Sequence, residues 1–219
     1  MWLSLAGLSA VLFDVDGTLI DSNAAHADSW AQALSEHGVA RDAPHIRPLV
    51  GMGSDKLLPM VGLEEGSSRA RAVVQRKKEL FTQRLPRLQP TPGARELVSY
   101  LRQQHKEIVI ATSADDDEMD ALLQQAGVRE LIPGRTSSDD ADRSKPDPDI
   151  VVAALHRTSS SPEQTAMIGD TPYDLEAASR AGVRAIALRC GGHWSDANLG
   201  GAVGIFDDPA GLLAYWQHG

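Results

Sequence analysis

The sequence predicts an α/β fold in which a parallel sheet carries helices on both faces and an α-helical cap is inserted into it. Short apolar runs alternate with helical stretches over most of the 219 residues. Such alternation is typical of parallel sheets built from right-handed crossovers. It is interrupted once, between about residues 20 and 89, where helical stretches follow one another with no strand between them.

The expected strands are short apolar runs that lead into polar segments. The first, residues 10–15 (AVLFDV), is almost continuously apolar, as expected for a strand covered on both faces. Further strands are expected at residues 107–112, 165–170 and 183–188, with a short last strand around Ile205.

Caps and apolar stripes identify the expected helices that accompany these strands. Residues 91–105 are expected to be helical, with Thr91 as N-cap and Pro92 in the first turn. Residues 115–127 combine acids in the first turn with an apolar stripe and Gly127 as a stop. More helices are expected at residues 148–155, at residues 173–182 and after Pro209.

The interrupting segment predicts a separate helical domain. Residues 22–38 have an apolar face that includes Trp30 and Leu34, and Gly38 ends the pattern. Residues 54–62 and 68–85 also have helical patterns. We therefore expect a cap domain at residues 20–89, inserted into a core domain of residues 1–19 and 90–219, with hinges at the two crossings.

Composition disfavours several kinds of partner. The formal net charge is −9 and there is no basic recognition helix, so we expect no nucleic-acid partner. The single cysteine, Cys190, is interpreted as a small core residue in a reducing compartment. The apolar N-terminus has no basic region and no run reaches membrane-span length, so we expect no signal peptide, no membrane partner and a cytoplasmic location. A monomer is the default expectation, with a dimer as the alternative.

Two carboxylates, Asp14 and Asp16, stand one residue apart where the first strand ends. Binding sites in parallel α/β sheets form beyond the carboxyl ends of strands. Two adjacent anions repel each other unless a cation lies between them, and a hard divalent ion such as Mg²⁺ suits oxygen ligands. The alternative is a solvated turn that is simply acidic, with Gly17 and Thr18 as turn formers.

Three later stretches favour a site over an acidic turn. A strand ends in the hydroxyls of Thr112 and Ser113, a Pro-bounded loop carries Lys145, and another strand ends in Asp170 with Asp174 four residues later. All of these can meet at one edge of a sheet. Carboxylates, a hydroxyl and a lysine together supply the nucleophile, metal ligands and oxyanion donors that phosphoryl transfer needs.

The four stretches together resemble the motifs of the haloacid dehalogenase-like (HAD) superfamily. Its DxDGT motif is residues 14–18, its strand-end Thr or Ser is Thr112, its Lys before Pro is Lys145, and its GDxxxD motif is residues 169–174. The resemblance covers nearly the whole chain in the family's order and implies a Rossmann-like core. The insertion after the first motif looks like the C1 cap of the phosphoglycolate phosphatase and β-phosphoglucomutase branch.

This resemblance implies roles for the acids. Asp14 would attack phosphorus and form an aspartyl-phosphate, and Asp16 would protonate the leaving alkoxide and later accept a proton from water. An Asp14 oxygen, the Asp16 backbone carbonyl and Asp170 would hold Mg²⁺.

The resemblance also implies roles for the neighbouring polar groups. Thr112 and Lys145 would hold the phosphoryl oxygens. Asp174 would orient Lys145 or a metal-bound water. Ser113 is secondary, with a structural role as its favoured alternative.

The cap is harder to interpret from sequence. His26 either faces the cleft or lies on a solvated helix face. Lys56, in the loop-like stretch 50–58, either meets an anionic substrate or lies in water on a helix that Ser54 caps. The basic run from Arg69 to Arg87 is interpreted as a solvated face, with steering of phosphate esters as the alternative.

Among functions, we favour a Mg²⁺-dependent phosphatase acting on a small phosphorylated metabolite such as phosphoglycolate or a sugar phosphate. A dehalogenase is disfavoured because its halide leaving group needs no proton, whereas Asp16 can supply one. The alternatives are a sugar phosphomutase of the β-phosphoglucomutase type and a non-catalytic binding or regulatory protein with the same fold.

Overall fold

The computed structural model describes residues 4–218, which contain one six-stranded sheet with the strand order β3-β2-β1-β4-β5-β6. Every neighbouring pair of strands is parallel. β1 therefore lies in the middle, between β2 and β4. The strands are β1 Ala10–Phe13, β2 Glu107–Ala111, β3 Gly134–Thr136, β4 Thr165–Gly169, β5 Arg184–Leu188 and β6 Gly204–Phe206.

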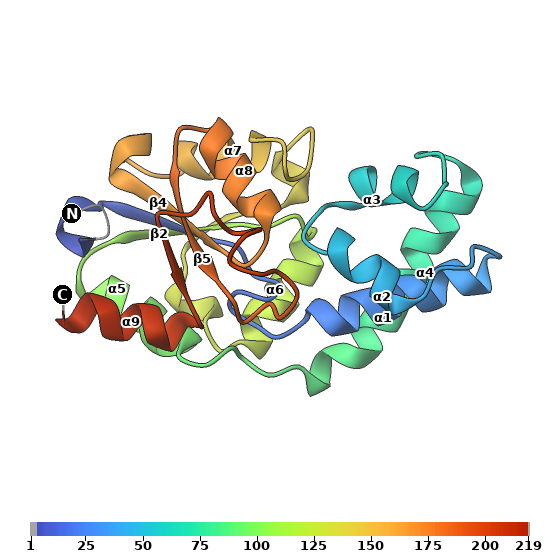
Figure 1. Cartoon of the computed structure of the whole chain (residues 1–219), viewed down its shortest axis with the longest axis horizontal. Helices are drawn as coiled ribbons and strands as arrows, with labels where there is room; N and C mark the ends of the chain where they lie inside the picture. The colour runs from blue at the N-terminus through green and yellow to red at the C-terminus, as the bar shows by residue number, and fades with distance from the viewer. Residues whose placement is uncertain (1–3, 219) are drawn as a thin grey trace.

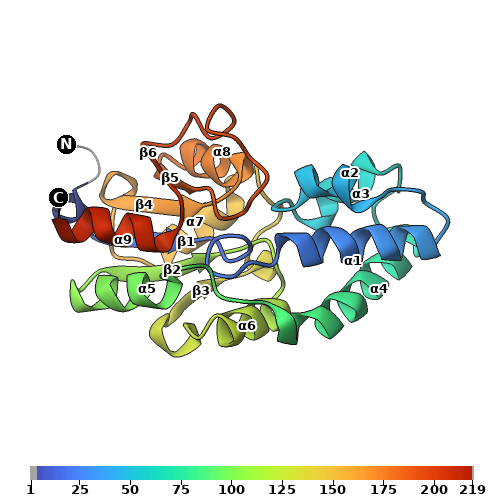
Figure 2. The same ribbon diagram turned by 60° about the horizontal axis from the view of Figure 1, so that its bottom comes forward.

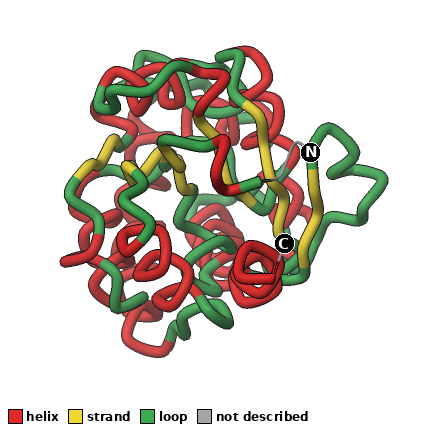
Figure 3. Tube along the Cα trace, turned by 90° about the vertical axis from the view of Figure 1, so that its left-hand side faces the viewer, coloured by secondary structure: helices red, strands yellow, loops and turns green. Residues whose placement is uncertain are grey.

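Helices cover both faces of the sheet, which confirms the predicted fold class (Figures 1 and 2). Figure 3 shows the strands between two layers of helices. Alternating side chains of β1 explain its continuous apolar character, since Phe13 packs with one apolar cluster and Leu12 with the other. The helices of this lobe are α5 Ala94–Gln103, α6 Asp116–Gln125, α7 Asp149–His156, α8 Pro172–Arg180 and α9 Pro209–His218.

A second lobe contains four helices and has its own apolar cluster (Figure 1). Trp30, Leu34, Val73 and Leu80 are among the buried residues that hold its two long helices together. Within residues 4–218, no helix combines the length and the apolar composition that crossing a bilayer requires. The helices of this lobe are α1 Asn23–Glu36, α2 Ala43–Ile46, α3 Ser54–Met60 and α4 Ser68–Arg84. Short 3-10 helices occur at Leu5–Gly7, Arg47–Leu49, Leu85–Arg87, Arg129–Leu131, Ser138–Asp140 and Pro162–Gln164.

Two residues that the sequence offers as N-caps do not cap their helices. The N-cap of α5 is Gly93, in the left-handed region at φ 76°, rather than Thr91. The Thr91 hydroxyl instead donates to the carbonyl of Thr18 at 2.6 Å, which ties together the two chain crossings between the lobes. The N-cap of α3 is Gly53 rather than Ser54, and it makes no side-chain hydrogen bond. The edge strand β3 is not predicted from the sequence, because it has only three residues and no apolar run.

Candidate active site

A buried lysine joins two of the predicted carboxylates. Lys145 Nζ donates to Asp14 Oδ1 at 2.6 Å and to Asp174 Oδ1 at 2.7 Å. Burial alone would lower the pKa of Lys145, but the charges of these two acids outweigh it and raise that pKa. The lysine is therefore held as an ammonium. We call Asp14, Lys145, Asp170 and Asp174 the floor of the site: Asp14 follows β1, Asp170 and Asp174 follow β4, and Lys145 lies in the loop between β3 and α7.

Local sequence fixes the position of Asp174 within the floor. It follows Thr171, the N-cap of α8, and the two side chains form a reciprocal capping box. A Cβ on Gly169 would lie 2.4 Å from the Asp174 carboxyl carbon, so only glycine leaves room for this side chain. Asp174 therefore presents one oxygen to Thr171 and the other to Lys145.

The floor carries more negative charge than Lys145 alone can balance. Asp14, Asp170 and Asp174 each place one carboxylate oxygen within 4.8 Å of the others. Burial, with Asp174 and Asp16 adding to it against the opposing charge of Lys145, raises the pKa of Asp14 to about 7. Burial and the charges of Asp14 and Asp174 also raise the pKa of Asp170 well above its ordinary value.

The floor fits a divalent cation. The Thr18 hydroxyl lies 3.5 Å from Asp14 Oδ2 and 3.4 Å from Asp170 Oδ1. Within residues 4–218 neither oxygen accepts a shorter hydrogen bond, so each acid keeps one oxygen available in a buried place where two anions repel each other. Hard cations such as Mg²⁺ prefer this kind of ligand. Asp174 is already engaged by Lys145 and Thr171, so Asp14 and Asp170 are the carboxylates best able to hold the ion.

Two glycines leave space for Asp170. A Cβ on Gly17, where φ is +74°, would lie 2.4 Å from Asp170 Oδ2, and a Cβ on Gly191 would lie 1.7 Å from it. Asn23, the first residue of α1, donates to the same oxygen at 2.7 Å. The Cys190 thiol donates to the carbonyl of Gly17 at 3.1 Å, and burial raises its pKa, so it stays a neutral thiol.

Asp16 turns away from the floor and toward the cap. Its carboxylate accepts hydrogen bonds from the Ser22 hydroxyl and from Nε2 of His26, the latter at 2.8 Å. Burial alone would raise the pKa of Asp16, but His26 and Ser22 together lower it to about 2. The His26 ring is held in place by stacking on Phe81, with ring centroids 3.9 Å apart.

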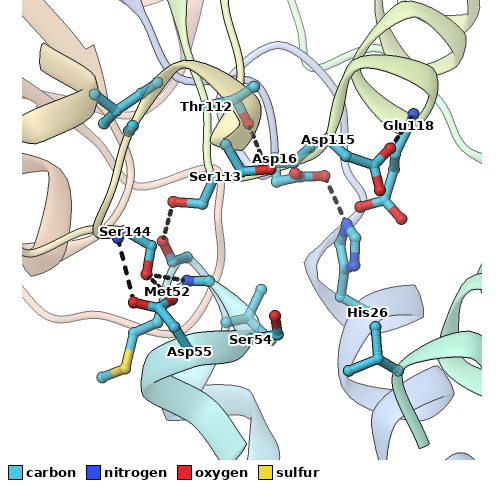
Figure 4. Close-up of a pocket in the computed structure, with 18 of the residues that line it drawn as sticks. Asp16, His26, Met52, Ser54, Asp55, Thr112, Ser113, Asp115, Glu118 and Ser144 are labelled. Atoms are coloured by element: carbon cyan, nitrogen blue, oxygen red, sulfur yellow. Dashed lines mark hydrogen bonds and ion pairs between the residues drawn. The ribbon is translucent and has the colours of Figure 1, made fainter. Parts of the chain in front are cut away.

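A cavity of about 360 Å³ lies between the two lobes and includes the edge of the floor. Figure 4 shows the His26–Asp16 contact on one side and the Asp55–Ser144 contact on the other. Thr112 and Ser113 also line it, and the Ser113 hydroxyl donates to the Gly51 carbonyl of the cap at 3.4 Å. Lys145, Asp170 and Asp174 lie beneath the cavity rather than in its lining.

Charged residues from both lobes form what we call the outer wall of this cavity. Two lysines of α4 cross from the cap to the core: Lys77 lies 2.9 Å from Glu118, and Lys78 lies 2.5 Å from Asp115. Asp115 is also the N-cap of α6 and accepts from the Glu118 backbone. The outer wall consists of Asp55, Lys77, Lys78, Asp115, Glu118, Asp139 and Asp142.

Two expectations for cap lysines need correction. Lys56 does not line the cavity, because its ammonium lies 2.6 Å from Asp147 of the core. Lys77 is not on a solvated face but is buried, with its ammonium 4.8 Å from the ring centroid of Phe81. A signal was present in the sequence: Lys77 occupies the apolar stripe of α4 in helical register with Val73 and Leu80.

Comparisons with known proteins identify the family to which this chain is similar. The family model described as haloacid dehalogenase-like hydrolase matches residues 11–188. The validoxylamine A 7'-phosphate phosphatase of Streptomyces hygroscopicus subsp. limoneus is 29% identical over 178 residues, which cover 81% of this chain and 84% of that protein. The phosphoglycolate phosphatase of Rhodospirillum rubrum is 28% identical, over 93% of this chain and 88% of its own. The crystal structure of a hydrolase from Pseudomonas syringae has a TM-score of 0.90 and 25% identity, covering 95% of this chain and 98% of that one.

Proposed function

The chain belongs to the haloacid dehalogenase-like hydrolases, and we propose that it is a Mg²⁺-dependent phosphatase of small phosphate monoesters that works through an aspartyl-phosphate. The observation that carries the proposal is the floor, in which Lys145 and two further carboxylates surround Asp14 beneath a cavity. Relatives named as phosphatases support the same reaction type.

Asp14 is proposed as the nucleophile. The Asp14 carboxylate would attack the phosphorus atom while the ester oxygen departs, and Lys145, bonded to its Oδ1, would hold it in position. Because Lys145 is buried as an ammonium and also bonded to Asp174, it is fixed before substrate arrives. Lys145 and the Thr112 hydroxyl would hold phosphoryl oxygens as their charge increases in the transition state. Mg²⁺ bound by Asp14, Asp170 and the Asp16 backbone carbonyl would supply neutralisation of the phosphoryl charge.

Asp16 is proposed as the general acid and base. Its low pKa keeps it ionised in the free enzyme, and an anionic phosphate nearby raises the pKa of a carboxyl group and favours proton uptake. The proton would pass to the leaving alkoxide. The carboxylate would then accept a proton from the water that attacks phosphorus and breaks the bond to Asp14. Ser22 and His26 orient this carboxylate from the cap side.

The lobes are proposed to be a core of residues 1–19 and 90–219 and a cap of residues 20–89 that opens to admit substrate. Separate apolar clusters in the two lobes support this division. Ser22 and Asn23 lie at the first crossing and contact Asp16 and Asp170, so cap closure would complete the surroundings of both acids. We keep a cytoplasmic, monomeric enzyme as the expectation from the sequence.

A phosphomutase is the disfavoured alternative. The position before Asp170, where sugar phosphomutases often carry a second acid, is Gly169, and the Asp174 carboxyl fills the space beside it. Any side chain there would displace the partner of Lys145. The chain is therefore adapted to an arrangement in which that extra acid is absent.

Hydrolysis of p-nitrophenyl phosphate tests the proposal. We expect the wild type to release p-nitrophenol with Mg²⁺ and to lose this activity in EDTA. Asp14→Asn is expected to lower kcat by about 10⁴-fold or more, as for other covalent nucleophiles, and Asp120→Asn, at an ion-paired acid outside the cavity, should not. Full activity of folded Asp14→Asn would contradict the assignment of the nucleophile.

A further inference from the structure

The charge of the outer wall is strongly one-sided. Beyond the floor and Asp16, the described residues that line the cavity include five carboxylates and two lysines but no arginine. The carboxylates come from both lobes: Asp55 from the cap, and the other four from α6 and from the loop that precedes Lys145. Asp139 and Asp142 lie exposed at the rim, where an arriving ligand passes.

Both lysines of the outer wall are already engaged. Lys77 donates to both carboxylate oxygens of Glu118, at 3.1 and 2.9 Å, and Lys78 lies 2.5 Å from Asp115. An anionic group that drew either lysine away would leave a carboxylate of the same wall without its partner. The wall thus offers no ammonium that is free to bind a second anion.

The N-terminus of α6, which faces the cavity, does not supply an anion site either. A helix N-terminus ordinarily attracts anions through its free N–H groups and its dipole. Here Asp115 caps the helix, and three more acids follow in the first turn. The chain's own carboxylates therefore already neutralise the partial positive charge of this helix end.

Neutral polar groups are plentiful in the same lining. Ser54, Ser113, Ser138 and Ser144 each contribute a hydroxyl, and Gly51 contributes backbone. Hydroxyl and carboxylate oxygens both accept hydrogen bonds from the hydroxyl or ammonium groups of a ligand. A polyhydroxylated carbon skeleton matches this lining better than a carboxylate or a second phosphate does.

From this wall we infer the substrate class, an inference that rests on the proposed phosphatase function. We propose that the enzyme hydrolyses phosphate monoesters of neutral or amine-bearing polyols and rejects substrates that carry a second anionic group. Among the described residues, Asp139 and Asp142 are the exposed acids of the outer wall that form no ion pair, and they act as the selecting residues. Like charges brought together in a binding site suppress the wrong ligand.

Two matched pairs of substrates test this selection. Sorbitol 6-phosphate and 6-phosphogluconate share an open six-carbon chain and differ in a hydroxyl against a carboxylate. Glucose 6-phosphate and glucosamine 6-phosphate differ in a hydroxyl against an ammonium. We expect kcat/KM for sorbitol 6-phosphate to exceed that for 6-phosphogluconate by at least about tenfold, and glucosamine 6-phosphate to match or exceed glucose 6-phosphate. If none of the four is turned over, their inhibition constants against p-nitrophenyl phosphate give the same ranking.

A pair of double variants separates the wall from overall charge. Asp139→Asn/Asp142→Asn removes two charges that line the cavity, whereas Asp116→Asn/Asp117→Asn removes two exposed charges nearby that do not. The first should raise relative activity on 6-phosphogluconate by about threefold or more, because like charges in the lining repel the carboxylate. The second should leave the ratio within about twofold, because Asp116 and Asp117 are outside the cavity lining and solvent and salt screen their charges.

The outcomes distinguish the two proposals. A wild type that hydrolyses p-nitrophenyl phosphate but handles 6-phosphogluconate as well as sorbitol 6-phosphate overturns the substrate class alone. Equal effects of the two double variants overturn the assignment to Asp139 and Asp142. Failure to hydrolyse any ester, p-nitrophenyl phosphate included, overturns the proposed function and this inference with it.

Discussion

The floor of the cavity is built from segments anchored to one sheet, whereas the outer wall joins two lobes. In the floor, Lys145 and its partners Asp14 and Asp174 all belong to the core, and their contacts do not depend on the cap. In the outer wall, Lys77 and Lys78 come from the cap, and Asp115 and Glu118 from the core. The Lys145 contacts of the floor are therefore made within one lobe, whereas the ion pairs of the outer wall need both lobes.

Replacing Lys145, the one positively charged side chain of the floor, should have the largest effect on stability. In Lys145→Met, two buried carboxylates lose their partner, and breaking a buried pair typically costs about 3–5 kcal/mol. Urea unfolding of the metal-free protein measures this. The control Lys56→Met breaks a half-exposed pair with Asp147 between the lobes and should cost less than about 1 kcal/mol. Similar losses of unfolding free energy in both variants would contradict the greater importance of the buried ion pairs of Lys145.

Binding of Mg²⁺ should stabilise the floor by relieving repulsion between its acids. At about 100 times its dissociation constant, a ligand adds about 2.7 kcal/mol of stability, which for a chain of this size raises Tm by about 5–10 °C. Asp170→Asn should lose most of this shift. The control Asp120→Asn, whose carboxylate pairs with Arg129 and Arg135, should keep it. An equal Mg²⁺ shift in Asp170→Asn would remove Asp170 from the ligand set.

Two adjacent lysines of α4 test whether the more buried ion pair of the outer wall contributes more to kcat/KM. The Lys77 and Glu118 side chains are 9% and 14% exposed, whereas the Lys78 side chain is 49% exposed. Lys77→Met should lower kcat/KM by about tenfold, equivalent to about 1.4 kcal/mol, because it leaves Glu118 unpaired in the cavity lining and removes a positive charge that acts on Asp16. Lys78→Met should change it by less than about fivefold, as for exposed ion pairs. Equal losses would show that burial is not the deciding factor.

The smallest expected effect belongs to a single hydrogen bond between the lobes. The Tyr173 hydroxyl donates to the Pro48 carbonyl at 2.6 Å, and the Tyr100 hydroxyl donates to the Trp216 carbonyl at 3.3 Å within the core. Each substitution by Phe should cost about 1 kcal/mol. Tyr173→Phe should raise KM because it loosens cap closure, and Tyr100→Phe should lower stability only. A raised KM in both variants would argue against a specific effect of the Tyr173 hydrogen bond on cap closure.

The residues of the floor could be predicted from the sequence because the carboxyl ends of parallel strands lie at one edge of the sheet. Once the apolar runs are assigned to parallel strands, Asp14, Thr112 and Asp170 must follow strands at the same edge. The structure has all three there, with Lys145 and Asp174 beside them. Each motif is short and local, so no knowledge of the cap was needed to find it.

The outer wall could not be predicted from the sequence, because it depends on how one lobe lies against the other. The pairing of Lys77 with Glu118 joins residues 41 positions apart on different helices, and no local pattern encodes it. Asn23 was missed for the same reason, since its partner Asp170 lies 147 positions away. The misplaced N-cap at Thr91 has another cause: its hydroxyl is used by the Thr18 carbonyl instead of by its own helix.

The missing side chain of Gly191 has a consequence for mutational surveys of the loop between β5 and β6. With no room for even a methyl group beside Asp170 Oδ2, an alanine at this position would push that carboxylate out of register. In an alanine scan, position 191 would then lose as much activity as a catalytic residue, although glycine has no side chain that could react. The loss would come from a steric clash with Asp170, so an alanine scan would wrongly identify Gly191 as catalytic.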